Sequence, residues 1–277
     1  MYVVETINVE ANKGNHDIYL ISTQDAKVNQ LTSNPGNEFS PRWTDQGKSY
    51  TYLSDESGTV QLYEVAVGSK EKKQLTFTDE GISSLEFVPN SNQVIYTSEV
   101  KTNKDVHDRY TDVPKSDAKI IDDLFYRYWN NWDDAYSTHL FLSNRYKDSI
   151  GLHSGTDLLQ GENYDVEGYA YANDNIAYTA KKLKGKDYAN STNTDIFLYN
   201  KTSQSTTNLS EGLMGYDLNP KFSKDGKKIA WTSMPTNGNE ADVSYLICYD
   251  LASKKIQTFA KDLGENIDDF VWNREAS

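Results

Sequence analysis

The hydrophobic and polar positions of this chain repeat a pattern of two alternating segments joined by a polar turn. Residues 40–54 and 219–233 match in register and without a gap, and residues 84–98 form a weaker copy. In each copy an aromatic residue precedes a turn rich in Asp, Asn and Gly, which tolerate the left-handed backbone of hairpins. These aromatic residues are Trp43, Phe87 and Phe222. Alternation with a period of two then predicts antiparallel strands with one buried face.

Two further short segments follow the repeated pair. A third, apolar segment recurs at 18–21, 61–65, 139–142, 195–199 and 245–249. A fourth, typified by Gln-Leu-Thr, closes most units at 29–32, 73–76 and 207–210, and more loosely at 256–259. Four short strands per unit are typical of a β-propeller blade, whereas a β-sandwich would not explain one pattern repeated in register. We therefore expect an all-β fold: a β-propeller of four-stranded antiparallel blades, with about five blade equivalents in a single domain over residues 1–277.

Both ends of the chain fall inside expected blades. First strands are expected at 37–43, 81–87, 163–169, 216–222 and 266–272. The residues near Tyr2 follow the pattern of a second strand, and the chain stops shortly after a first strand. The pattern thus predicts a partial propeller from a longer polypeptide. The alternative is a five-blade ring closed by the last and first segments.

One connection is much longer than the others. An insertion at residues 100–137 separates a second strand from its third strand. Loops of this length in a compact domain are usually functional or disordered. The aromatic residues concentrated in 125–132 are too many for all of them to remain exposed to solvent. They either pack against the neighbouring blades or form a recognition surface, because aromatic residues with Arg are the usual anchors of an interface.

Composition and charge exclude some partners. The net charge of −13 argues against binding to nucleic acid or to an anionic membrane surface. No apolar run reaches the length of a transmembrane helix, and no signal peptide begins the sequence. The only cysteine, Cys248, lies in an apolar strand segment and is expected to be buried.

Catalytic and metal-binding motifs are missing. The sequence has no Gly-x-Ser-x-Gly nucleophile elbow, and 151–155 has the wrong order for one. The four histidines are scattered, and His139 at a strand start is expected to be structural. The acidic pairs at 122–123, 133–134 and 268–269 lack the spacing of a calcium loop. We expect no catalytic residue, metal site or cofactor within this chain.

The repeat resembles a known family. Ser-Pro-Arg-Trp at 40–43, with Lys-Gln-Leu-Thr at 73–76, resembles the TolB-type propeller repeat, which is also that of the N-terminal propellers of prolyl oligopeptidase-family serine peptidases. The stretch Leu-Phe-Tyr-Arg-Tyr-Trp-Asn-Asn-Trp at 124–132 resembles the bacterial dipeptidyl-peptidase and acylaminoacyl-peptidase branch. The resemblance covers essentially the whole chain. It departs from the family in having fewer blades and in lacking the α/β-hydrolase domain with its Ser, Asp and His.

The resemblance implies a function. The chain would be the non-catalytic propeller of a serine exo- or oligopeptidase, gating and helping to bind peptide substrates for a C-terminal α/β-hydrolase domain of the same polypeptide. It implies a periplasmic or extracellular location. The alternative is a TolB-like protein-binding propeller with no attached enzyme. The residues expected to bind substrate or partner are Asp122, Asp123, Tyr126, Arg127, Tyr128, Trp129 and Trp132.

Overall fold

The computed structural model describes residues 1–89, 91–124, 126–128, 131–132, 135–146, 149–152 and 155–273. It divides into two compact units, each described by itself below. Unit 1 comprises residues 1–100 and 139–160, and unit 2 comprises residues 101–138 and 161–277. The expected single domain over residues 1–277 stays a prediction.

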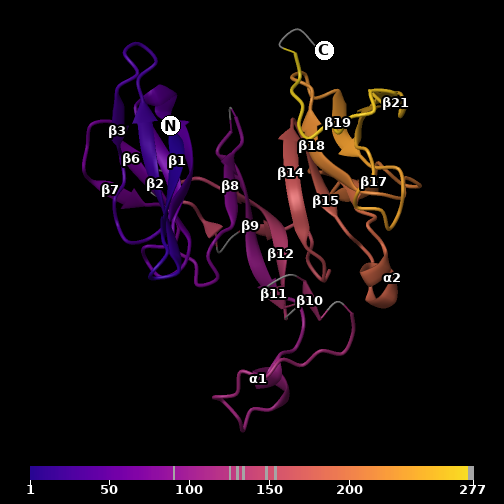
Figure 1. Cartoon of the computed structure of the whole chain (residues 1–277), viewed down its shortest axis with the longest axis horizontal. Coiled ribbons are helices and arrows are strands. Elements are labelled where there is room, and N and C mark those ends of the chain that lie inside the picture. Colours follow the sequence, from indigo (N-terminus) through magenta and orange to yellow (C-terminus); the bar gives the residue numbers. More distant parts are fainter. Residues whose placement is uncertain are drawn as a thin grey trace. The chain divides into compact units, whose positions relative to one another are not determined.

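Unit 1 contains three antiparallel sheets, shown in indigo to magenta in Figure 1. The first is three-stranded: β1 (Tyr2–Asn8), β2 (Lys13–Ile21) and β3 (Val28–Gln30). The second consists of β4 (Glu38–Thr44), β5 (Ser49–Ser54), β6 (Gln61–Ala66) and β7 (Lys72–Gln74), with a 3-10 turn at Asp45–Gly47. The third consists of β8 (Ser84–Phe87), β9 (Gln93–Lys101), β12 (Tyr136–Asn144) and β13 (Thr156–Asp157), in the spatial order β13-β12-β9-β8. The C-terminal end of β9 and the N-terminal end of β12 belong to unit 2.

Unit 2 contains two four-stranded antiparallel sheets and the insertion. One sheet consists of β14 (Val166–Ala172), β15 (Asn175–Ala180), β16 (Asp195–Asn200) and β17 (Ser205–Asn208). The other consists of β18 (Asp217–Phe222), β19 (Lys228–Ser233), β20 (Tyr245–Asp250) and β21 (Ile256–Phe259). A short helix, α2 (Gly185–Asn190), connects β15 to β16. The insertion carries α1 (Val106–Arg109) and a small hairpin of β10 (Arg127–Tyr128) and β11 (Asn131–Trp132).

The register confirms that the repeats are equivalent. Three first-strand aromatics each pair with the second-strand residue seven positions later: Trp43 with Tyr50, Phe87 with Val94, and Phe222 with Ile229. The polar turn therefore has the same length in these three sheets. In the β14–β17 sheet a tighter turn instead joins Ala172 directly to its partner Asn175. The all-β propeller class is thus confirmed as a series of four-stranded sheets, with a three-stranded one at the start of the chain.

Three expected first strands differ from the structure. The strand expected at 81–87 begins only at Ser84. The strand expected at 163–169 runs from 166 to 172, and the buried Tyr164 precedes it. The strand expected at 266–272 is wrong, since residues 266–273 form no regular strand. This segment contacts β18 through a side chain instead: the indole Nε1 of Trp272 donates a hydrogen bond to the carbonyl of Lys221 at 3.0 Å.

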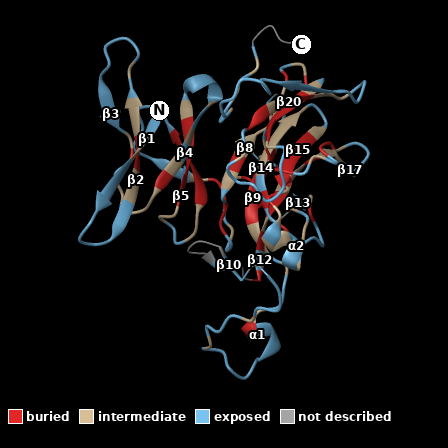
Figure 2. Cartoon of the chain, turned by 45° about the vertical axis from the view of Figure 1, so that its right-hand side comes forward, coloured by how far each residue is buried: buried red, intermediate tan, exposed pale blue. Residues whose placement is uncertain are grey.

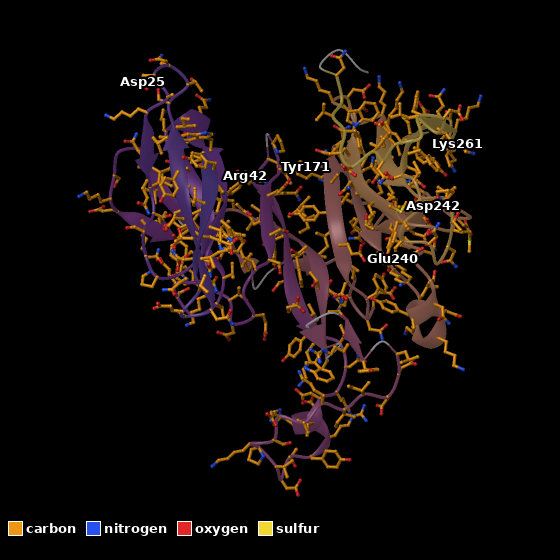
Figure 3. All side chains as sticks on the ribbon, in the orientation of Figure 1. Asp25, Arg42, Tyr171, Glu240, Asp242 and Lys261 are labelled. Atoms are coloured by element: carbon orange, nitrogen blue, oxygen red, sulfur yellow. The ribbon has the colours of Figure 1, made fainter. Side chains whose placement is uncertain are left out.

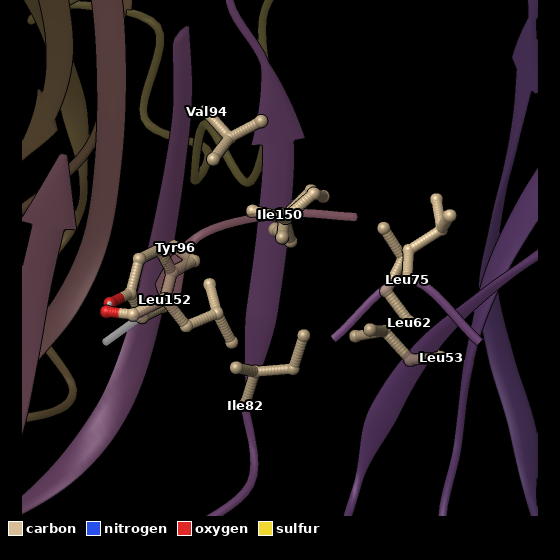
Figure 4. Packing of buried hydrophobic residues seen from close by; sticks show 9 residues of the cluster. Leu53, Leu62, Leu75, Ile82, Val94, Tyr96, Ile150 and Leu152 are labelled. Carbon is tan, nitrogen blue, oxygen red and sulfur yellow. Dashed lines mark hydrogen bonds between the residues drawn. The ribbon is translucent and has the colours of Figure 1, made fainter. Parts of the chain in front are cut away.

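Each unit has a core between neighbouring sheets. Strands β5, β15 and β19 are buried at five of their six positions, as the red strands of Figure 2 show. In unit 1, Leu53 and Leu62 pack with Val94 and Tyr96 of the next sheet (Figure 4). In unit 2, a corresponding cluster is centred on Trp231, which is fully buried. These second strands are thus buried on both faces, whereas their alternating pattern predicted one buried face, because other parts of the fold cover both sides of each strand.

The Leu-Thr or Leu-Ser end of the fourth segment has a structural role. The hydroxyl oxygen of Thr32, Thr76 or Ser210 accepts a hydrogen bond from the backbone N–H of the third-strand residue fourteen positions earlier, at 2.8, 2.8 and 2.9 Å. The preceding leucine donates its N–H to the carbonyl of the same third-strand residue, at 2.8 Å in each case. Because each hydroxyl bonds a buried strand amide as the chain leaves the sheet, this motif fixes where these three sheets end.

Candidate functional site

The insertion begins and ends at hydrogen-bonded positions. The backbone N–H of Thr102 donates to the carbonyl of Ala135 at 2.8 Å, and the hydroxyls of Thr102 and Ser137 are 3.1 Å apart. Ala135 and Val106 are buried. The two ends of the insertion are therefore held together, as expected for residues 100–137.

The helix α1 is fixed by charged groups. Asp105 forms a capping box with Asp108, since each residue's side chain accepts the backbone N–H of the other. The ammonium of Lys101 lies 2.7 Å from the Asp105 carboxylate and 2.5 Å from that of Asp108. The hydrogen bond from Lys101 lowers the pKa of Asp105, so this cap remains charged in mildly acidic solution.

The hairpin β10–β11 places a cation on an aromatic ring. Arg127 and Trp132 are cross-strand partners, and the Arg127 guanidinium lies 5.3 Å from the centre of the Trp132 indole. This cation–π contact orients the guanidinium. Trp132 is 46% exposed and the neighbouring Tyr126 is 54% exposed. The hairpin thus presents an Arg and two aromatic rings to solvent.

Other apolar side chains of the insertion are also exposed. Figure 2 shows the segment around α1 coloured almost entirely as exposed. The large apolar residues exposed here are Tyr110, Val113, Ile121, Leu124, Tyr126 and Trp132. Of the two alternatives for these aromatic residues, the geometry of the described ones favours an exposed surface over packing against blades. We call Tyr126, Arg127 and Trp132 the arm surface.

The two adjacent aspartates do not converge on one point. Asp122 forms an ion pair with Arg109 at 2.6 Å. Asp123 accepts the N–H of Leu124 at 2.8 Å, and its carboxylate lies against Gly185, where a Cβ would come within 2.9 Å of Oδ1. Gly185 also has a φ of +58°, a conformation that favours glycine. Trp129, Asp133 and Asp134 lie outside the described residues, as does any side-chain contact of Tyr128.

Two neighbouring loops were not anticipated from the sequence. The loop that carries α2 adjoins the insertion at Gly185, and at its other end the Ser191 hydroxyl donates to the Asn237 side chain at 2.6 Å. Asn237 belongs to the β19–β20 loop, which also carries Glu240 and Asp242 (Figure 3). These connections all join a second to a third strand. Their shared position in the repeat is the signal that could have grouped them with the insertion.

A buried histidine of unit 1 is paired with an aspartate. His139 is buried, and its Nδ1 lies 2.8 Å from the carboxylate of Asp157. Its Nε2 has no hydrogen-bond partner, so among the described residues no serine or cysteine faces it. His153 and Ser154 lie outside the described residues. No group of three or more His, Cys, Asp or Glu that could hold a metal is found in the part of the chain that the structure describes. Within that same part, no helix is long and apolar enough to span a bilayer.

Comparison with known proteins agrees with this architecture. Residues 5–126 match the family model of the TolB β-propeller domain. The acylaminoacyl peptidase of Pyrococcus horikoshii superposes on 97% of this chain and 39% of its own, with a TM-score of 0.69 and 15% identity. The β-propeller domain of the trilobed protease from Pyrococcus furiosus superposes on 97% of this chain and 70% of its own, with a TM-score of 0.56 and 11% identity. The chain therefore has the fold of a β-propeller segment, and residues 5–126 match the TolB-type propeller model.

The sequence relatives are more specific. Dipeptidyl-peptidase 5 of Porphyromonas gingivalis is 36% identical over 98% of this chain, which covers 41% of that protein. Dipeptidyl-peptidase 5 of Porphyromonas endodontalis is 31% identical over 88% of this chain and 36% of its own length. The chain thus spans about two-fifths of the length of these curated relatives. The resemblance to propellers of the dipeptidyl-peptidase and acylaminoacyl-peptidase branch is confirmed.

Proposed function

We propose that this chain is the non-catalytic propeller part of a serine peptidase of the dipeptidyl-peptidase class. The observation that carries the proposal is the 36% identity to a dipeptidyl-peptidase 5 over nearly all of this chain. Because that relative is more than twice as long, the proposal places a catalytic α/β-hydrolase domain in the same polypeptide. The described residues supply no activated nucleophile, so the propeller would gate and help to bind peptide substrates.

The arm surface is proposed as the part that meets the peptide. Arg127 is oriented by Trp132, and both groups remain accessible on the hairpin. A fixed guanidinium can donate hydrogen bonds to a backbone carbonyl, and the exposed rings beside it can stack on an apolar side chain. Because no new residues need to be ordered, the entropic cost of binding is limited. Asp122 and Asp123 are engaged with Arg109 and Leu124, so they would support the insertion rather than bind the peptide.

The test measures hydrolysis by the complete polypeptide that contains this chain. In Arg127→Ala and Trp132→Ala, we expect the KM for chromogenic dipeptidyl substrates to rise by about tenfold with little change in kcat, because a binding contact made equally in the ground and transition states is lost. Phe259→Ala is the matched control, since it removes an exposed aromatic ring from β21.

Each result separates the proposal from its alternatives. A complete polypeptide without dipeptidyl-peptidase activity would overturn the peptidase assignment and favour a TolB-like binding propeller. Active enzyme with unchanged KM in both arm variants would remove the arm surface from substrate binding. A lower melting temperature with wild-type KM would make the contact between Arg127 and Trp132 purely structural. The periplasmic or extracellular location stays a prediction.

A further inference from the structure

Three buried oxygen atoms at one junction in unit 1 lack hydrogen-bond partners. They are the Oδ1 atoms of Asn15 and Asp17 on β2, and the Oε2 atom of Glu38 at the start of β4. Glu38 is fully buried and Asp17 is 8% exposed. A buried acceptor without a donor is costly, and a buried carboxylate without a counter-charge is more costly still. A bound cation or a proton on one carboxylate would remove this cost, and the described Lys and Arg side chains form no ion pair with either carboxylate.

The backbone brings the two carboxylates together. The residues on either side of Asp17 both bond to groups next to Glu38. The His16 N–H donates to the side chain of Asn37 at 3.3 Å, and the Ile18 N–H donates to the Thr32 hydroxyl at 2.8 Å. Asn15 is two residues from Asp17 on the same strand face, and its amide nitrogen donates to the other oxygen of Asp17 at 3.2 Å.

Both the Asp17 charge and burial act on Glu38. Burial is the larger effect. Together, burial and the Asp17 charge raise the pKa of Glu38, although hydrogen bonds from Thr32, Asn34 and Ser54 lower it in part. The Ser54 hydroxyl donates to Oε1 at 3.3 Å, which leaves Oε2 without a partner. No Lys or Arg among the described residues forms an ion pair with Asp17 or Glu38. The two carboxylates are thus close enough for the Asp17 charge to act on Glu38, and neither forms an ion pair with a cation of the described residues.

Equivalent positions of the repeat have side-chain donors within the chain, although the Oδ2 atom of Asp217 also lacks a partner. In the β4–β7 sheet, Gln61 stands where Asp17 stands, and its amide oxygen accepts the Thr76 hydroxyl at 2.8 Å. In unit 2 the two positions are Asp195 and Asp217. There the Ser210 hydroxyl donates to Asp195 at 3.1 Å and the Trp231 indole donates to Asp217 at 2.8 Å. The junction at Asp17 and Glu38 has no counterpart of the Trp231 donor, because Tyr52 stands there and forms no described bond to Glu38.

We propose that Asp17, Glu38 and the Asn15 amide oxygen bind a hard divalent cation of the calcium class at this junction. Two carboxylates and an amide oxygen are the oxygen ligands that calcium prefers. A bound cation would neutralise both carboxylates and link β2 to β4, so it would stabilise the contact between the first two sheets of unit 1.

The test uses the chain after removal of metals with a chelator. Calcium chloride at millimolar concentration should raise its melting temperature by about 5 °C, as expected for a ligand well above its Kd. Asp17→Asn and Glu38→Gln should abolish the shift, and Asp217→Asn, the matched control in unit 2, should retain it. If either variant unfolds at a lower temperature than wild type, terbium luminescence sensitised by nearby tyrosines measures cation binding directly.

Two outcomes would overturn the proposal. If wild type binds no calcium or terbium, and Glu38→Gln is more stable than wild type at neutral pH, the carboxylates share a proton instead of a cation. If Asp17→Asn and Glu38→Gln retain the calcium shift, the cation binds elsewhere. Magnesium in place of calcium distinguishes a calcium-class site from one that prefers the smaller octahedral ion.

Discussion

Asp217 shows how a single buried residue ties a blade to its neighbours. It lies at the start of β18 with no exposed surface, and the Trp231 indole donates to its carboxylate at 2.8 Å. Its backbone N–H and carbonyl both bond the Thr194 hydroxyl, at 2.9 and 3.0 Å. Burial raises the pKa of Asp217 to about 7, more than its hydrogen bonds lower it.

This raised pKa predicts a pH-dependent stability. Between about pH 4 and pH 7, folded Asp217 keeps a proton that the unfolded chain releases, so the free energy of unfolding should fall as pH rises. Its contribution to the slope should approach about 1.4 kcal/mol per pH unit. Asp217→Asn should remove this contribution, because the amide stays neutral. Urea denaturation of both proteins from pH 4 to pH 8 measures the difference, and equal slopes would contradict the assigned pKa.

At the scale of elements, the fourth-segment hydroxyl determines where each blade ends. Thr76 and Ser210 accept strand amides in different units with the same geometry, so the motif acts locally and does not depend on which blade carries it. Replacing the hydroxyl leaves a buried N–H without an acceptor, which costs more than the hydrogen bond itself contributes.

Thr76→Ala and Ser210→Ala should each lower the free energy of unfolding by about 1–3 kcal/mol. Thr258→Ala, on the exposed strand β21, should change it by less than about 0.5 kcal/mol. Denaturant titration gives the energies, and hydrogen exchange at the Leu62 and Ile196 amides locates the effect. Normal protection of these amides in the variants would mean that water replaces the hydroxyl.

At the scale of the whole molecule, the buried sheets and the accessible loops have different roles. Its sheets bury apolar second strands, while the insertion and the second-to-third-strand loops carry accessible polar and aromatic groups. The pair of His139 and Asp157 resembles the His-Asp half of a triad, but no described nucleophile faces the histidine.

The purified chain should therefore show no dipeptidyl-peptidase activity, because hydrolysis of an amide needs a nucleophile activated by a base. Chromogenic dipeptidyl substrates provide the assay, with His139→Gln as the companion variant. Turnover that survives repurification and disappears in His139→Gln would show that this chain contains its own catalytic site.

The candidate site was only partly predictable. The density of aromatic residues near Arg127 identified the insertion, because such residues rarely stay in an ordinary loop. The pairing of Arg127 with Trp132 requires a hairpin whose register the sequence does not specify. The roles of Asp122 and Asp123 were not predictable either, because the contact with Arg109 depends on how the insertion folds back on itself and Gly185 lies in another loop.

By itself, the sequence determined the strand repeat, the hairpin turns and the place of the insertion, because these depend on alternation and on turn residues close in the chain. Only the tertiary structure decided what depends on distant contacts. Residues 266–273 follow the strand pattern but form no strand, since pairing requires a partner that local pattern cannot supply. Likewise, Asp17 and Glu38 look like ordinary polar residues until folding buries them together, because the cost of burying charge arises only when water is removed.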